Sequence, residues 1–202
     1  MYQSAVQFDE ILQHVSTSAP SSEAAVGRKV LPLRHPERRI LPGVERRLDL
    51  VNPGLLEVFR ALVTGQAPWP LYVHGPTGAG KTMAVLCLCD IAETACYWPV
   101  EDLCDFIMRE SPVEVQGEFR RVAEKGLAVL DELGQRATIG DLHYSAVKRF
   151  ADARELHAGR VAIYISNLAP KVFAELYDDR IWSRVLCGTR YELAGDDRRC
   201  SR

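Results

Sequence analysis

The sequence predicts an α/β fold, a three-layer αβα sandwich in which helices cover both faces of a parallel sheet. Short apolar runs alternate with amphipathic segments along most of the chain, and strands separated by helices are typical of parallel sheets. One of these runs leads directly into the octet GPTGAGKT, and a helical pattern follows it. With 202 residues, 47% of them hydrophobic, the chain can bury one sizeable core.

Composition and charge narrow the class of protein. The net charge of -2 gives no global attraction to nucleic acid or to a membrane, so such contacts need a local patch. We find no stretch with the length and apolarity of a membrane span and no secretion signal at the N-terminus, so the expected compartment is the cytoplasm. The six cysteines show no metal-ligand spacing, and we interpret them as reduced thiols.

The first 49 residues are expected to form an arm and a linker. Residues 1–15 predict a short amphipathic helix, which either docks on a partner or packs back on the core. Its apolar stripe consists of Phe8, Ile11, Leu12 and Val15. Residues 16–49 predict a flexible, basic linker, because small polar residues come first and the segment 28–47 carries seven Lys or Arg against two Glu. The folded domain is then expected at residues 50–202.

The domain is expected to begin with a helix. Asn52 and Pro53 form an N-cap followed by a proline at the first helical position, and Gly65 ends the pattern. The apolar run PLYVH at 70–74 predicts a buried strand, and a helix is expected over 81–94. The glycine-rich octet lies between these two elements.

The rest of the domain repeats the alternation. Strands are expected at 95–100 and 126–133, separated by one or two helices within 101–124. A further helix ends at Gly159 and is followed by a strand at 161–167. The stripe of that helix consists of Leu142, Ala146, Phe150 and Ala153. Four strands are therefore expected in all.

Residues 75–82 match the phosphate-binding pattern G-x-x-x-x-G-K-[ST] between a strand and a helix. Glycines let main-chain amides close around phosphate oxygens, and the helix N-terminus adds partial positive charge. Lys81 is expected to reach the β and γ phosphates and Thr82 to ligate Mg²⁺. The sequence thus predicts binding of a nucleoside triphosphate together with Mg²⁺. The predicted contact residues are Gly75, Pro76, Thr77, Gly78, Ala79, Gly80, Lys81, Thr82 and Met83.

Two adjacent acids, Asp131 and Glu132, end a predicted central strand. Asp131 is positioned to hold Mg²⁺ through water, and Glu132 to polarise an attacking water as general base. A metabolite kinase uses its acidic groups on an acceptor and needs no such pair. The pattern therefore favours hydrolysis, although acidic pairs at strand ends also occur in ordinary surface turns.

These motifs resemble the AAA+ ATPases, and within them the DnaC/IstB-like group of bacterial helicase loaders and transposition helper ATPases. GPTGAGKT is similar to the Walker A motif of that group and LAVLDELG to its Walker B motif. The segment 150–170 resembles the helix and strand that lead to sensor 1, which implies a catalytic role for Asn167. The alternative is a strand-end asparagine that satisfies a turn.

Two further segments carry the resemblance toward the C-terminus. YDDRIWSRVLCG is similar to box VII and implies that Arg184, or else Arg180, enters the nucleotide site of a neighbouring subunit. The alternative is a surface salt bridge from Arg184 to Asp178 or Asp179. GDDRR at 195–199 resembles the end of loader ATPase domains and implies nucleotide contact by Arg198 or Arg199.

The resemblance implies a Mg-dependent AAA+ ATPase without a C-terminal lid domain, assembled as a head-to-tail homo-oligomer. Its implied partners are a replicative helicase and single-stranded DNA. One alternative is a transposition helper that meets a transposase on duplex DNA. Another is an adaptor in which ATP binding, rather than turnover, controls a protein contact, and a metabolite kinase is a more distant alternative.

Overall fold

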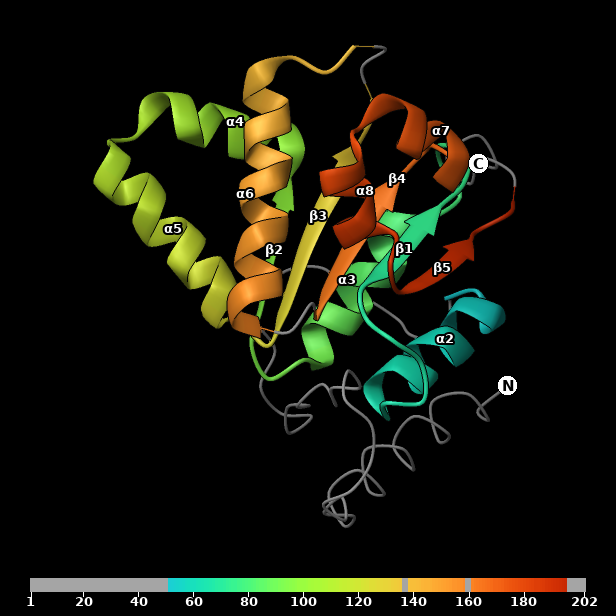
Figure 1. Ribbon diagram of the computed structural model, residues 1–202. Helices are drawn as coiled ribbons and strands as arrows, with labels where there is room; N and C mark the ends of the chain where they lie inside the picture. Colours follow the sequence, from blue (N-terminus) through green and yellow to red (C-terminus); the bar gives the residue numbers. More distant parts are fainter. Residues whose placement is uncertain (1–50, 136–137, 159–160, 196–202) are drawn as a thin grey trace.

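The computed structural model describes residues 51–135, 138–158 and 161–195, which form a three-layer α/β structure (Figure 1). Its five strands make one sheet in the order β2-β3-β4-β1-β5, and every neighbouring pair is parallel. The strands are β1 (Leu71–His74), β2 (Ala95–Pro99), β3 (Leu127–Leu133), β4 (Ala162–Ser166) and β5 (Thr189–Glu192). The predicted α/β class with a parallel sheet is confirmed.

Helices cover both faces of the sheet, and strand residues alternate between two apolar clusters. On β1, Leu71 and Val73 join the cluster that contains residues of α2 and α3, whereas Tyr72 joins the cluster on the other face. The helices on the first face are α2 (Pro53–Val63) and α3 (Lys81–Ile91). Those of the second cluster are α4 (Val100–Arg109), α5 (Pro112–Glu124), α6 (Asp141–Ala158), α7 (Pro170–Leu176) and α8 (Asp179–Val185). Figure 1 shows α5 on the outer side, against α6.

Local signals place the helix ends. The Asn52 side chain accepts hydrogen bonds from the main-chain N–H groups of Gly54 and Leu55, so it caps α2 as its position before a proline predicts. Ser111 and Glu114 form a capping box that starts α5. This cap divides the predicted helical stretch 101–124 into two helices.

The expectation of four strands was wrong by one, because β5 was not foreseen. Its sequence, TRYE, contains no continuous apolar run, and its side chains are alternately half-buried and exposed. It pairs only with β1, at the edge of the sheet. A short edge strand of this kind has no periodic signature that distinguishes it from a polar loop.

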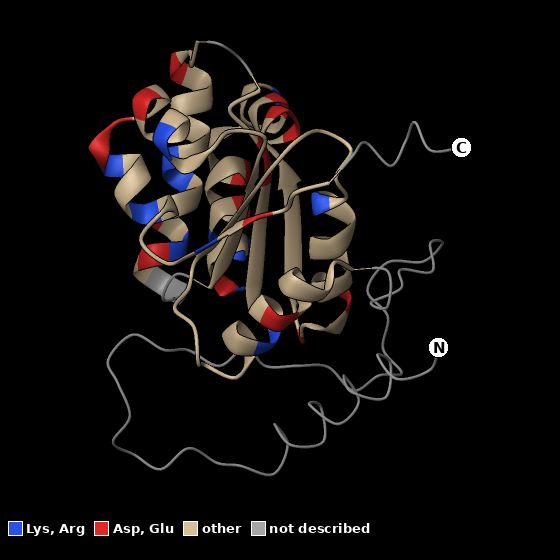
Figure 2. Ribbon diagram, turned by 90° about the vertical axis from the view of Figure 1, so that its right-hand side faces the viewer, with Lys and Arg blue, Asp and Glu red and all other residues tan. Residues whose placement is uncertain are grey.

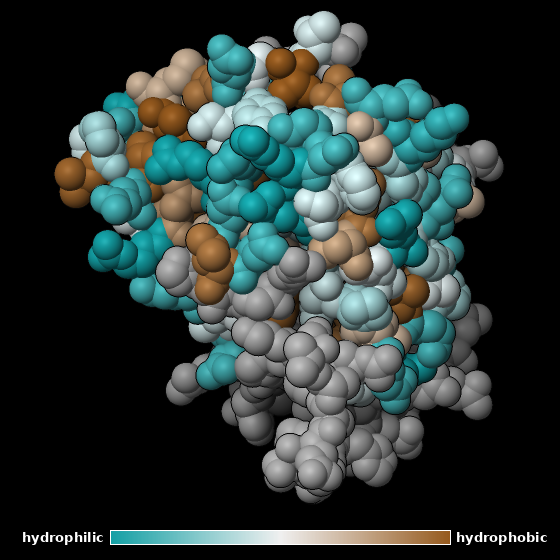
Figure 3. Space-filling model, viewed as in Figure 1, coloured by the Kyte–Doolittle hydropathy of each residue, from teal (hydrophilic) through white to brown (hydrophobic). Residues whose placement is uncertain are grey.

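The surface of the described residues carries both charged and hydrophobic side chains, without a clear division into separate regions in the views shown. Charged residues of both signs lie mainly on the helices (Figure 2), and Figure 3 shows hydrophobic residues interspersed with hydrophilic ones on the visible face. Met108 and Val113, near the junction of α4 and α5, are among the most exposed large hydrophobic residues, at 64% and 79%. No helix in these ranges combines the length and apolarity needed to cross a membrane.

The predicted arm at 1–15, the predicted linker at 16–49 and the two arginines Arg198 and Arg199 lie outside the described residues. They remain predictions.

Candidate nucleotide-binding site

The glycine-rich octet forms a tight loop between β1 and α3. Gly80 stands at the N-cap of α3 with φ 95°, a left-handed conformation that glycine adopts without strain. At Gly75, with φ 143°, a Cβ atom would lie 2.2 Å from the main-chain oxygen of Leu193. Only glycine therefore lets the loop pass this close to the segment that follows β5.

Lys81 is the first residue of α3, and its side chain folds back over the loop. The residue is 7% exposed. Its Nζ donates to the main-chain oxygens of Gly75 and Pro76 and to Oδ1 of Asn167, each at 2.8 Å. The predicted phosphate lysine and the predicted sensor asparagine are thus in direct contact, although 86 residues separate them in the sequence.

Asp131 lies at the carboxyl end of β3, next to the start of α3. Its Oδ2 accepts hydrogen bonds from the Thr82 hydroxyl and from the Tyr97 phenol, both at 2.7 Å. Its Oδ1 accepts from the main-chain N–H of Glu132 at 2.6 Å. The residue is 3% exposed, and three donors are what a buried carboxylate needs to offset the loss of water.

Glu132 departs from strand geometry. Its φ is 66°, and the pairing of β3 with β4 shifts between Leu130 and Leu133. In a regular strand, neighbouring side chains point to opposite faces. The bulge and the left-handed backbone instead leave the exposed Glu132 side chain beside Asp131, at the same cavity.

The cavity that these residues share has a volume of about 210 Å³. It lies at the carboxyl ends of β1, β3 and β4, which are neighbours in the sheet, and ligands of open parallel sheets bind at such an edge. Its lining residues are Thr77, Gly78, Gly80, Lys81, Thr82, Met83, Asp131, Glu132, Gln135, Ile165, Ser166 and Asn167. The structure therefore brings the predicted loop, the acidic pair and Asn167 together.

These residues fit a triphosphate with Mg²⁺. Main-chain amides at the start of α3 and the Lys81 ammonium suit phosphate oxygens, and the Thr82 hydroxyl and Asp131 carboxylate are the hard oxygen donors that Mg²⁺ prefers. Within the described ranges no three His, Cys, Asp or Glu side chains form a metal cluster. Such a cluster is not needed for Mg²⁺, which is usually held by one or two carboxylates, phosphate oxygens and water.

Sequence reasoning missed Tyr97 and Ser166. Tyr97 lies on β2, and burial, followed by the hydrogen bond to Asp131, raises the pKa of its phenol, so the group is a donor at neutral pH. Ser166, 1% exposed, donates to the main-chain oxygen of Leu133 at 2.6 Å and joins β4 to β3 beside the cavity. Both contacts depend on the register between strands, which local sequence does not encode.

The two arginines proposed for the neighbouring site lie on α8 and do not line the cavity. Arg184 Nε lies 3.0 Å from Asp152 Oδ1 and 2.6 Å from Glu155 Oε2, both on α6. The salt bridge expected as the alternative, to Asp178 or Asp179, is therefore not the one that forms. Arg180 is exposed, and its guanidinium makes no hydrogen bond or salt bridge within the part of the chain that the structure describes.

Solved structures of replication proteins share the fold of this chain. DnaA bound to AMPPCP and single-stranded DNA is similar with a TM-score of 0.63 and 18% identity, over 75% of this chain and 50% of that one. DnaI is similar with a TM-score of 0.59 and 17% identity, over 75% of this chain and 89% of that one. The DnaC helicase loader is similar with a TM-score of 0.57 and 18% identity, over 73% of this chain and 95% of that one.

The chain has the fold of these DNA replication proteins. At these identities the likeness establishes the fold alone, and the chain spans about half the length of DnaA bound to AMPPCP. Neither the family models nor the curated proteins gave a match to the sequence. A loop of the pattern G-x-x-x-x-G-K-[ST] between a strand and a helix is suited to phosphate oxygens, and in this chain it opens on the cavity at the carboxyl end of β1.

Proposed function

We propose that this chain is a Mg-dependent ATPase that converts ATP and water to ADP and phosphate. One observation carries the proposal. Residues from the start of α3, the end of β3 and the position directly after β4 line a single cavity: Lys81, Thr82, Asp131, Glu132 and Asn167. A phosphate-binding loop alone would suit a kinase or a passive binder, but the added carboxylate beside the cavity suits activation of water.

Each side chain has a separate role in this proposal. Lys81 exchanges its contacts with the loop oxygens and Asn167 for contacts with phosphate oxygens. The released Asn167 amide then orients the attacking water or a γ-phosphate oxygen, and Glu132 accepts the proton of that water. Mg²⁺, held by Thr82 and through water by Asp131, would neutralise charge on the phosphates.

Two substitutions test the chemistry. Lys81→Ala is expected to weaken ATP binding, because it removes the cation of the loop. Glu132→Gln is expected to keep ATP binding and to lose turnover by about 10²-fold or more, because it removes a general base. Binding is measured with a fluorescent ATP analogue and turnover by phosphate release. Glu124→Gln, an exposed change at the far end of α5, is the matched control; full turnover by Glu132→Gln would remove Glu132 from the base role.

We further propose that the ATPase loads a replicative helicase and couples its ATP state to helicase and single-stranded DNA binding. Support comes from the likeness to DnaI and to the DnaC helicase loader over most of their lengths, and to DnaA bound to single-stranded DNA. The predicted arm at 1–15 and the basic segment at 28–47 are the proposed partner contacts. A transposition helper and a nucleotide-dependent adaptor are the alternatives.

The alternatives separate in binding experiments with the Glu132→Gln protein, which would hold ATP. A loader is expected to bind purified replicative helicase and a labelled single-stranded oligonucleotide more tightly with ATP than with ADP. A transposition helper would prefer duplex DNA and a transposase. An adaptor would show ATP-dependent protein binding although the wild-type chain hydrolyses almost no ATP.

A further inference from the structure

Tyr97 reaches across the sheet to the proposed Mg²⁺ site. It lies on β2, the edge strand beside β3, in register with Val129, two residues before Asp131. Its ring packs against the apolar cluster on the α2 and α3 face, and its phenol donates to Asp131 Oδ2 at 2.7 Å. Tyr97 therefore contacts the carboxylate of Asp131, the residue that holds Mg²⁺ through water in the proposed function.

The Asp131 carboxylate is fixed by three donors from three different segments. Thr82 donates from α3, Tyr97 from β2, and the main-chain N–H of Glu132 from β3 itself. Of the two side-chain donors, Thr82 belongs to the phosphate-binding loop and helix, where it would also ligate Mg²⁺. Tyr97 is set in the sheet and has no other assignment at the site.

We propose that Tyr97 is a positioning residue for the magnesium site, and that its phenol O–H orients the Asp131 carboxylate toward the cation held by Thr82. The inference rests on the proposed function. With Oδ2 held by Tyr97 from the side of the sheet, the carboxylate keeps one orientation while the Thr82 hydroxyl turns an oxygen lone pair to Mg²⁺. Partners of this kind, behind a ligand, typically change metal affinity by about 10- to 100-fold.

Tyr97→Phe tests the role, because it removes the hydroxyl and keeps the ring. We expect the Mg²⁺ concentration that gives half-maximal binding of a fluorescent ATP analogue to rise about 10-fold or more, while binding in EDTA stays unchanged. Electron paramagnetic resonance of Mn²⁺ bound to the protein–ADP complex measures the same loss without any turnover. Asp131→Asn serves as the positive control, with a loss at least as large.

Tyr144→Phe is the matched control. Tyr144 of α6 donates its phenol O–H to Asp178, the N-cap residue of α8, at 2.7 Å, the same kind of bond at the same length, and neither residue lines the cavity. For Tyr144→Phe, the Mg²⁺ dependence of nucleotide binding and the binding of Mn²⁺ are expected to match those of the wild type. Unchanged metal dependence in Tyr97→Phe would overturn the positioning role, and so would an equal loss of binding in EDTA, which indicates a collapsed pocket. Failure of the wild-type chain to bind Mg-ATP would instead overturn the proposed function.

Discussion

At the scale of the residue, the backbone of Glu132 is the feature that makes the acidic pair usable. Asp131 and Glu132 are adjacent, so a regular strand would place their side chains on opposite faces of the sheet. The φ of 66° at Glu132 prevents this. For a non-glycine residue the left-handed conformation costs about 1 kcal/mol. Backbone strain of this kind concentrates at functional sites, and here it allows both carboxylates to line one cavity.

The cost of that backbone can be measured. We predict that Glu132→Gly unfolds with a free energy about 1 kcal/mol higher than Glu132→Ala, because glycine adopts the left-handed conformation without a clash of its Cβ. Both variants should lose turnover, since both lack the carboxylate. Urea unfolding of the two proteins, followed by circular dichroism, gives the difference. Equal stability of the alanine and glycine variants would show that the backbone at this position is not strained.

Sequence reasoning identified the residues of the site where covalent spacing fixes them. Lys81 and Thr82 follow the glycine loop directly, and Asp131 and Glu132 end one apolar run, so local pattern was enough to name them. Tyr97 could not be found in this way. Its role depends on the parallel register that places Pro99 opposite Asp131, and that register is set by packing of the whole sheet.

At the scale of the element, one buried cation holds the end of α5 to the sheet. Arg154 of α6 is 1% exposed, and burial lowers its pKa to about 10, so it stays charged at neutral pH. Its terminal nitrogens donate to main-chain oxygens in the last turn of α5, in the connection from α5 to β3, and in the residue directly before β4. These acceptors are Val122, Ala123, Lys125, Gly126 and Val161. The side chain thus satisfies carbonyl groups that a helix C-terminus leaves without partners.

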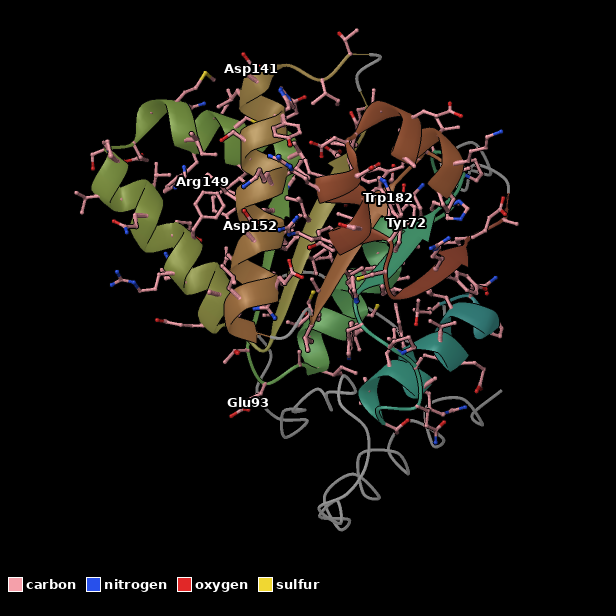
Figure 4. All side chains as sticks on the ribbon, in the orientation of Figure 1. Tyr72, Glu93, Asp141, Arg149, Asp152 and Trp182 are labelled. Atoms are coloured by element: carbon pink, nitrogen blue, oxygen red, sulfur yellow. The ribbon has the colours of Figure 1, made fainter. Side chains whose placement is uncertain are left out.

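Replacement of this arginine should be costly. Arg154→Met is expected to lower the free energy of unfolding by about 3 kcal/mol, because buried carbonyl oxygens lose charged donors. Arg154→Lys should recover little, since one ammonium cannot reach all the acceptors. Arg149→Met is the control. Arg149 lies on α6, on the side of α5 (Figure 4), and its Cζ atom is 4.3 Å from the centroid of the Phe119 ring. Such a cation–π contact contributes about 1 kcal/mol. A loss at Arg154 no larger than that at Arg149 would contradict this role.

The elements that the sequence predicted are those with a strong period or a continuous apolar run. β1, β3 and β4 are buried along almost their whole length and were found. β5 was not predicted, because an edge strand pairs on one side only and does not need a continuous apolar run. Its side chains are alternately half-buried and exposed. Helices α7 and α8, of 7 residues each, are too short for a stripe to separate them from the surrounding loops.

At the scale of the whole molecule, α8 carries two arginines in different environments. Arg184 Nε lies within salt-bridge distance of the Asp152 and Glu155 carboxylates of α6, and the Arg184 side chain is 29% exposed. Asp152, one of these partners, lies on α6 in Figure 4. An arginine that acts on a neighbouring subunit must be free to leave its own chain. We therefore propose that Arg180 is the arginine that acts on a neighbouring subunit, and that Arg184 attaches α8 to α6.

This assignment predicts how activity returns when two inactive proteins are mixed. Arg180→Ala should fold and bind ATP normally but lose turnover, because an arginine supplied in trans contributes about 10³-fold or more to the rate. In an equimolar mixture with Glu132→Gln, about a quarter of head-to-tail interfaces combine an intact Glu132 with an intact Arg180, so turnover should reappear. Arg184→Ala should instead lower stability, and Arg109→Ala, an exposed arginine of α4, should change neither property. Phosphate release at a series of mixing ratios checks the prediction. Restored turnover with Arg184→Ala, and none with Arg180→Ala, would return the role to Arg184.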